Sequence, residues 1–315
     1  MTGPSPGPRA GTLAGRFAGP LAAPVADPLA DQVAGSADAR INPEIVRASA
    51  VLFGRERDRV PGEPISVSWP CLDIDLAYAV QDQTLRRRLA AGGSLVGVAL
   101  GTLAGGEPAE PVTGWLTDSM ALPIGRPVPH GTLIAASAAP ELAFVLASRL
   151  AGPGVTAARA MSAVGAVCAA VRVTDSRYRD PEPFGPACPA GPAGSAVPAV
   201  STAPTGPDLA ADNAGVAAFV TGPVTLAPSA LDLSLEACLL EVDGEVVGSA
   251  TGAAVPGGQA GALAAAANLL AARGRALEPG WVVLTGMLTD PVPLRLSGVL
   301  AVHFTTLGTI VLPAG

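Results

Sequence analysis

The stretch Cys238-Leu-Leu-Glu-Val-Asp-Gly-Glu-Val-Val-Gly-Ser-Ala250 carries the clearest structural signal in this chain of 315 residues. Two runs typical of β-strands, 239–242 and 245–249, are joined by Asp243-Gly244. An Asp-Gly pair between two such runs predicts a tight hairpin, because both turn positions need a positive φ that Asp tolerates and Gly adopts freely. The segment therefore predicts two antiparallel strands within a strand-rich domain.

Further short β-type runs, many of them bounded by Gly or Pro, extend this domain from about residue 94 to the end of the chain. They lie at 95–100, 133–138, 142–146, 168–173, 219–221, 282–285, 299–304 and 310–312. Two helices are expected between them, at 156–164 and 261–273. Strands interrupted by few helices predict a mixed α/β (α+β) fold.

The first part of the chain has a different pattern. Residues 1–40 are rich in Ala, Gly and Pro and are predicted to form a disordered tail. A helix is expected to begin at Asn42, a favourable N-cap, with Pro43 at the first helical position. Gly54 or Gly62 is expected to end this helix.

A second helix is expected over 72–89, where apolar residues recur on one face. Its C-terminal end carries Arg86, Arg87 and Arg88, which suit the negative end of the helix dipole and are predicted to form a solvated cap. Residues 41–93 are therefore predicted as a small helical part that precedes the main domain, 94–315.

Residues 180–208 are predicted to form a flexible insertion in the main domain. The segment is dominated by Pro, Gly and Ala and is long for an ordered connection. The sequence leaves open whether it is an ordered lid over a site or a disordered loop.

Composition excludes several classes of function. The chain is 49% hydrophobic but only 3% aromatic, so its core is expected to consist of Ala, Val and Leu. All 19 basic residues are arginine, which excludes Schiff-base chemistry and a P-loop lysine. The net charge is −7 and no basic stripe appears, which argues against nucleic acid and anionic membranes as partners.

The cysteines and the hydropathy pattern indicate a soluble, cytoplasmic protein. Cys71, Cys168, Cys188 and Cys238 show no C-x-x-C spacing, which argues against a zinc knuckle or a redox pair and favours free thiols in a reducing compartment. No apolar run reaches the roughly 18 residues that a membrane-spanning helix needs.

Nine short motifs occur in order along residues 72–308. They are LDIDLAYAVQ (72–81), VGVALGT (96–102), LTDSMALP (116–123), APELAFVL (139–146), VRVTDSR (171–177), ADNA (211–214), DGEVVGSATGAAV (243–255), LTGMLT (284–289) and FTTLG (304–308). In order and spacing they resemble the 2-keto-4-pentenoate hydratase and 4-oxalocrotonate decarboxylase group of the fumarylacetoacetate hydrolase superfamily. The resemblance implies a rolled mixed β-sheet with flanking helices, a small-molecule carbonyl or polyene substrate, and a homo-oligomer.

The sequence departs from this group at the metal site. The group binds magnesium or manganese through a Glu-x-Glu pair and a third, distant Glu. Here residues 139–141 read Ala-Pro-Glu, and Arg172 stands at the third position. The group's lysine is replaced by Ala99, and 257–259 lack its histidine. One carboxylate is a poor site for a hard dication, so we expect neither a metal nor another cofactor.

The candidate catalytic residues are Glu141, Arg172 and Asp118. If the backbone of the group is kept, the Arg172 guanidinium lies where the ion would be, pairs with Glu141 and holds an oxyanion or enolate. The alternative is a buried salt bridge that fills an abandoned site. Asp118 is a candidate general base, and the alternative is a solvated loop carboxylate.

The candidate substrate-binding residues each have an ordinary structural explanation as well. They are Asp175, Arg177, Asp212, Asn213, Thr285, Gly286 and Thr289. Asp and Asn at strand ends and turns often bond to the local backbone, and Arg often braces a neighbouring loop. A glycine after a strand allows either a simple turn or a close approach of backbone to ligand.

Three hypotheses of function remain open. The first is a lyase or isomerase that performs metal-independent acid–base isomerisation, dehydration or cyclisation of an enolisable or polyene carbonyl compound, by analogy in polyketide-type secondary metabolism. The second is a catalytically inactive paralogue that serves as a partner or scaffold. The third is a residual 2-hydroxydienoate hydratase, its metal held by Glu141 with Asp118 or Asp175.

Overall fold

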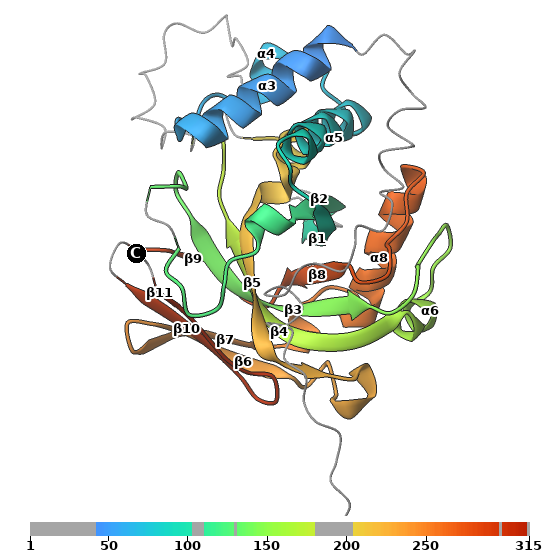
Figure 1. The fold of residues 1–315 in the computed structure, drawn as a ribbon, viewed down its shortest axis with the longest axis vertical. Coiled ribbons are helices and arrows are strands. Elements are labelled where there is room, and N and C mark those ends of the chain that lie inside the picture. The colour runs from blue at the N-terminus through green and yellow to red at the C-terminus, as the bar shows by residue number, and fades with distance from the viewer. Residues whose placement is uncertain (1–41, 103–109, 129–130, 180–203, 296–297, 314–315) are drawn as a thin grey trace, which may run out of the picture.

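The structure is a computed structural model that describes residues 42–102, 110–128, 131–179, 204–295 and 298–313. The predicted tail and most of the predicted insertion at 180–208 lie outside the described residues. Figure 1 shows three layers: N-terminal helices, a seven-stranded sheet below them, and a four-stranded sheet at the opposite end. The predicted mixed sheet with flanking helices is confirmed. None of the described helices is long and apolar enough to cross a membrane.

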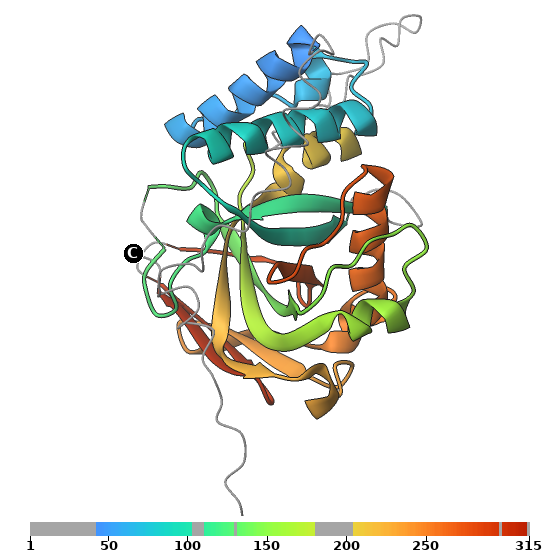
Figure 2. The ribbon, with the colours of Figure 1, turned by 45° about the vertical axis from the view of Figure 1, so that its right-hand side comes forward.

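The N-terminal layer consists of α3 (Pro43–Asp58), α4 (Ile65–Ser68) and α5 (Ile74–Ala90), with α7 (Gly206–Ala211) packed beneath α5 (Figure 2). Asn42 caps α3 as predicted, since its side chain accepts a hydrogen bond from the Glu44 N–H. The expected end at Gly54 or Gly62 is wrong. The helix continues to the left-handed Arg59, because a single glycine does not break a helix that packs against a neighbour.

The arginine run at the end of α5 does more than cap the helix. Arg88 forms an ion pair with Glu56 of α3, with a distance of 2.6 Å between Nη2 and Oε2. Arg87 Nε donates to the Ser49 hydroxyl of α3 at 3.1 Å. The predicted solvated cap is therefore wrong for these two residues, which bind the two long helices together.

The seven-stranded sheet carries the centre of the molecule. Its order is β2 (Pro111–Thr117), β1 (Leu95–Thr102), β8 (Val282–Met287), β3 (Ser137–Leu146), β4 (Val164–Thr174) and β5 (Val216–Leu226), with β9 (Val292–Pro293) beside β3. Among the described strands of this sheet, β1 and β8 pair in parallel and the other neighbours pair antiparallel. The expected strand 142–146 lies within β3, and Pro140 does not interrupt the pairing of β3 with β4. The expected strand 133–138 is wrong over 133–136, because β3 begins at Ser137 and the N–H groups of Ile134 and Ala135 bond to the Asp175 carboxylate instead of to a neighbouring strand.

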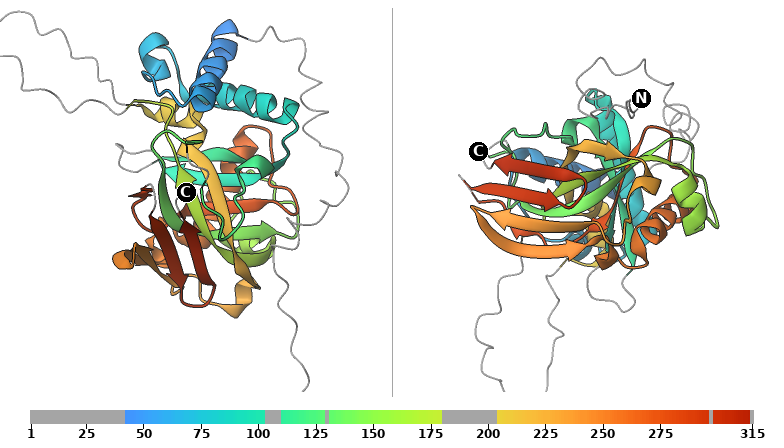
Figure 3. Two further views of the ribbon diagram at one scale, coloured as in Figure 1. Left: turned by 60° about the vertical axis from the view of Figure 1, so that its left-hand side comes forward. Right: turned by 90° about the horizontal axis from the view of Figure 1, so that it is seen from below.

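The four-stranded sheet contains the predicted hairpin. Its order is β11 (Gly308–Pro313), β10 (Val299–Phe304), β6 (Ala237–Val242) and β7 (Glu245–Thr251), side by side in the right panel of Figure 3. The turn residues Asp243 and Gly244 have φ values of 53° and 89°, as the tight hairpin requires. The remaining helices are α6 (Ala157–Ser162), α8 (Gly258–Ala272) and short 3-10 turns at Asp118–Met120, Asn213–Gly215, Pro228–Ala230 and Gly252–Ala254.

The rolled sheet buries both of its faces, as the burial of β3 and β4 along nearly their whole length shows. One face packs against α8 and the four-stranded sheet through residues such as Phe144, Leu240 and Leu263. The other face carries a separate apolar cluster that includes Ala170 and Phe219. The expected core of Ala, Val and Leu is confirmed, and the second cluster adjoins the candidate site.

The parallel contact between β1 and β8 requires glycine at position 97. A Cβ on Gly97 would lie 1.9 Å from the Val282 carbonyl oxygen, whereas a Cβ on Gly54 in α3 would meet nothing within 4 Å. We expect Gly97→Ala to lower the free energy of unfolding by about 1–3 kcal/mol. Gly54→Ala should raise it by about 0.5–1 kcal/mol. Urea denaturation followed by circular dichroism measures both, and equal effects would contradict the described register.

Candidate functional site

The register of β3 and β4 places Glu141 and Arg172 on the same face of the sheet. Ala139 lies directly opposite Arg172, and Glu141 lies opposite Ala170. Side chains two residues apart on a strand share a face, and residues directly opposite each other share it too. Positions 139, 141 and 172, which the sequence resemblance associates with metal ligands, therefore lie together.

Arg172 and Glu141 form a two-pronged ion pair. Arg172 Nε donates to Glu141 Oε2 at 2.8 Å, and Arg172 Nη2 donates to Oε1 at 2.6 Å. Nη2 also donates to the Leu100 carbonyl of β1 at 2.8 Å, and the Gly286 N–H of β8 donates to Oε1. The side chains are 1% and 0% exposed. Four strands thus meet at one charge pair.

The Nη1 amino group of Arg172 remains available. It makes no hydrogen bond within the described residues, while Nε and Nη2 are both engaged. The guanidinium is therefore fixed along one edge and keeps two N–H donors on its remaining nitrogen. A preorganised donor of this kind suits an oxygen atom that gains negative charge during a reaction.

The electrostatic environment of the pair is simple. Burial raises the pKa of the Glu141 carboxyl, while the Arg172 guanidinium and the Gly286 N–H act in the opposite direction. Arg172 is the only charged side chain that contributes to the pKa of Glu141 among the described residues. The two charges therefore balance each other.

The donor set does not fit a divalent metal ion. Both Glu141 oxygens already accept hydrogen bonds, Ala139 offers no side-chain oxygen, and Arg172 is itself a cation. Magnesium and manganese need several oxygen ligands. Within the ranges that the structure describes, no group of three or more His, Cys, Asp or Glu side chains is arranged to hold a metal.

Arg177 and Asp212 form a second buried ion pair, 3% and 2% exposed. Arg177 Nε donates to Asp212 Oδ1, Nη2 donates to the Asp212 carbonyl, and the Arg177 N–H donates to Oδ2 at 3.1 Å. Burial raises the pKa of Asp212 to about 6, and Arg177 opposes this rise. The pair connects the chain after β4 to the end of α7.

Three other predicted site residues also bond to nearby backbone. Asp175 accepts from the N–H groups of Ile134 and Ala135 at 2.9 and 2.8 Å. Asn213 exchanges hydrogen bonds with the backbone of Trp115 at 2.7 and 3.0 Å. Asp118 accepts from the Ser94 and Ser119 N–H groups. None of the three bonds to Glu141 or Arg172 within the described part of the chain.

The end of β8 contributes one residue directly. Gly286 reaches Glu141 with its N–H at a φ of 135°, a conformation that side chains rarely adopt. Thr285 donates to the buried Gln259, whose amide donates to the Gly252 carbonyl at 3.0 Å. The Thr289 hydroxyl donates to the neighbouring Asp290 carbonyl. Thr285 thus connects β8 to α8 next to Gly286, whereas the Thr289 hydrogen bond stays within the loop after β8.

Two groups that contribute to the candidate site were not predicted from the sequence. The Leu100 carbonyl accepts from Arg172, and a backbone acceptor leaves no signal in the sequence. Gln259 is 4% exposed and bonds to Thr285. Its position could have indicated a role at the site, because it lies in the stretch where the hydratase and decarboxylase group usually has a histidine.

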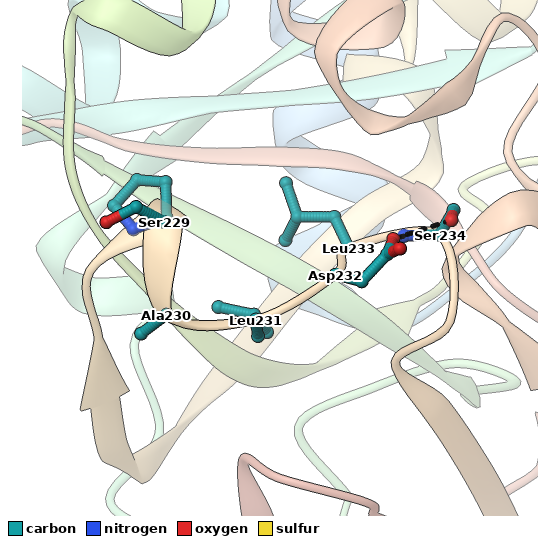
Figure 4. A pocket seen from close by; sticks show the side chains of 7 residues that line it. Ser229, Ala230, Leu231, Asp232, Leu233 and Ser234 are labelled. Carbon is teal, nitrogen blue, oxygen red and sulfur yellow. Dashed lines mark hydrogen bonds between the residues drawn. The ribbon is translucent and has the colours of Figure 1, made fainter.

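Two surface hollows lie away from the pair. One follows the 3-10 turn Pro228–Ala230 and is lined by Pro228–Ser234, where the Asp232 carboxylate accepts from the Ser234 hydroxyl (Figure 4). The other, of about 410 Å³, lies on the four-stranded sheet beside His303. Neither hollow contains a predicted catalytic or substrate-binding residue.

Known proteins resemble the chain over most of its length, although no family model matches it. It is 30% identical to 4-oxalocrotonate decarboxylase of Pseudomonas sp. strain CF600, covering 78% of this chain and 87% of that protein. It is 30% identical to 2-oxo-hept-4-ene-1,7-dioate hydratase of Escherichia coli, covering 81% and 92%. It is 32% identical to 2-keto-4-pentenoate hydratase of Burkholderia vietnamiensis, covering 78% and 88%.

A solved structure agrees with this relation. 4-Oxalocrotonate decarboxylase from Pseudomonas putida G7, complexed with magnesium and adipate, superimposes with a TM-score of 0.77 at 27% identity. The match covers 87% of this chain and 98% of that one. The two proteins thus share their fold over most of both chains.

The pair at the centre of the sheet should show strong thermodynamic coupling. Removal of one partner leaves a buried, unpaired charge, so Glu141→Leu and Arg172→Met should each lower the free energy of unfolding by about 3–5 kcal/mol. The double variant should lose clearly less than the sum of the two, as urea denaturation can measure. Arg149→Met at the exposed pair with Glu278 is the control, with an expected loss below about 1 kcal/mol. Additive losses at 141 and 172 would contradict the pairing.

Proposed function

The chain belongs to the 2-keto-4-pentenoate hydratase and 4-oxalocrotonate decarboxylase family of the fumarylacetoacetate hydrolase superfamily, and we propose that it is a hydratase-like enzyme that works without a divalent metal. In this proposal Arg172 binds the carbonyl oxygen of an enolisable or polyene compound. One observation carries the proposal: Glu141 fixes the guanidinium along one edge and leaves Nη1 without a partner among the described residues.

The chemistry follows from the donor geometry. Isomerisation, dehydration and cyclisation of such compounds share an intermediate in which negative charge gathers on the carbonyl oxygen. The α-proton of the substrate passes to solvent water or hydroxide, and the Nη1 donors of Arg172 stabilise the enolate that remains. A single preorganised donor of this type contributes about 10²–10³ in rate. Glu141 acts as a positioning residue, since Arg172 and Gly286 engage both of its oxygens. A place in polyketide-type secondary metabolism is part of the proposal and rests on analogy alone.

The other candidate residues take supporting roles in this proposal. Asp175, Arg177, Asp212 and Asn213 shape the loops around the sheet through the bonds described above. Asp118 holds the turn after β2 and is not required for stabilisation of the enolate. Gly286 supplies the N–H that orients Glu141.

A second candidate function is that of a catalytically inactive partner or scaffold. The near-complete burial of Glu141 and Arg172 favours it, because a closed ion pair also explains a filled site. A residual metal-dependent hydratase is not favoured by the donor set, since Asp118 and Asp175 both bond to backbone elsewhere.

Hydrogen–deuterium exchange separates the two candidates. We expect the wild-type protein to accelerate exchange at the α-carbon of cyclohexanone in D₂O, equally with and without EDTA, as proton NMR can follow. Arg172→Lys keeps the charge but loses the planar fork and should slow exchange by about 10²–10³. Arg149→Met, on the surface, should behave as wild type. Exchange that needs added Mg²⁺, or no exchange by the folded wild type, would contradict the proposal.

A metal site can be rebuilt if positions 139, 141 and 172 share a face. Ala139→Glu with Arg172→Glu would place three carboxylates together with Glu141. We expect this double variant to bind Mn²⁺, seen by electron paramagnetic resonance and by a Mn²⁺-dependent rise in Tm. The matched control is Ala138→Glu with Arg172→Glu, since residue 138 faces the other side of β3. Binding by the control or by the wild type would argue against this geometry.

A further inference from the structure

The charge balance around Arg172 defines the class of substrate more narrowly, provided that the proposed function holds. The Glu141 carboxylate neutralises the guanidinium, so the pair offers donors but no net positive charge. A substrate carboxylate that entered this buried place would bring a negative charge without a counter-charge. Burial of an unpaired charge is strongly unfavourable.

Within the described residues, no second cation is available to pair with such a carboxylate. Ala99 stands on β1 beside Leu100, whose carbonyl accepts from Arg172. Arg177 is engaged by Asp212 through its side chain and its backbone. No other charged side chain of the described residues acts on the ionisation of Glu141. A carboxylate and a neighbouring carbonyl would therefore have to share the two N–H donors of Nη1.

The side chains that lie opposite the pair in the sheet are apolar. Arg172 lies between Ala139 on β3 and Phe219 on β5, directly opposite both, and Ala170 lies opposite Glu141. Direct opposition places these side chains on the face of the sheet that carries the pair. Ala99, Ala170 and Phe219 also belong to one buried apolar cluster. These three side chains are apolar and buried, so they offer no polar partner for a charged group.

We infer that the site takes an uncharged carbonyl compound, such as a ketone or an ester, in preference to a 2-oxo carboxylate. The carbonyl oxygen accepts from Nη1 of Arg172, and the carbon skeleton packs against the alanine and phenylalanine side chains. The negative charge appears only on the enolate oxygen during the reaction, where the donors are already in place.

A matched pair of probes tests the inference: 2-oxopentanoate and its methyl ester share a skeleton and differ in charge. Exchange at C3 in D₂O is followed by NMR for both, with the full-length protein. We expect the enzyme-dependent rate for the ester to exceed that for the acid at least tenfold, after subtraction of the uncatalysed rates. Arg172→Lys should slow the ester reaction, which ties the preference to the guanidinium.

Substitution at position 99 provides a second test. Ala99→Lys adds a cation beside the pair and should shift the preference toward 2-oxopentanoate. Ala99→Met has similar length without charge and should keep the preference for the ester, whatever its effect on the rate. Equal or faster exchange of the acid by the wild type would overturn the inference while the metal-independent function stands. Exchange of neither probe would overturn both.

Discussion

The ion pair between Glu141 and Arg172 is the constraint on which the centre of the structure depends. Both charges are buried, and burial of either charge without its partner would strongly destabilise the protein. Satisfying them requires the Leu100 carbonyl and the Gly286 N–H, so the pair fixes how β1, β8, β3 and β4 meet. In the proposed function, the position of the substrate relative to the guanidinium follows from these contacts.

Local sequence signals correctly predicted backbone features that one or two residues determine, such as a turn or the start of a helix. Asp243-Gly244 defined the hairpin, and Asn42 defined the start of α3, because turns and caps depend on few atoms. Signals that depend on packing failed. Gly54 does not end α3, since α5 supports the helix beyond it, and Arg88 turned toward Glu56 rather than toward water. Tertiary contacts of this kind have no local pattern in the chain.

The candidate site was predictable only in part, and the reasons are physical. Resemblance brought positions 139, 141 and 172 together, and the strand register explains why they share a face. Residue type alone could not decide between substrate binding and backbone capping for Asp175 and Asn213, because the same oxygen and amide groups serve both; the structure shows their bonds to backbone. That Nη1 of Arg172 has no hydrogen-bond partner among the described residues follows from three-dimensional contacts, which no local sequence pattern indicates.

The central claim is that a covalently attached cation occupies the place that a divalent ion takes in metal-dependent members of the family. A crystal of the wild-type protein grown with excess Mn²⁺, measured at the manganese absorption edge, tests this claim most directly. The account predicts no anomalous peak at Glu141 and a guanidinium that stays paired with its carboxylate. A strong peak coordinated by Glu141, with the Arg172 side chain turned toward solvent, would contradict it.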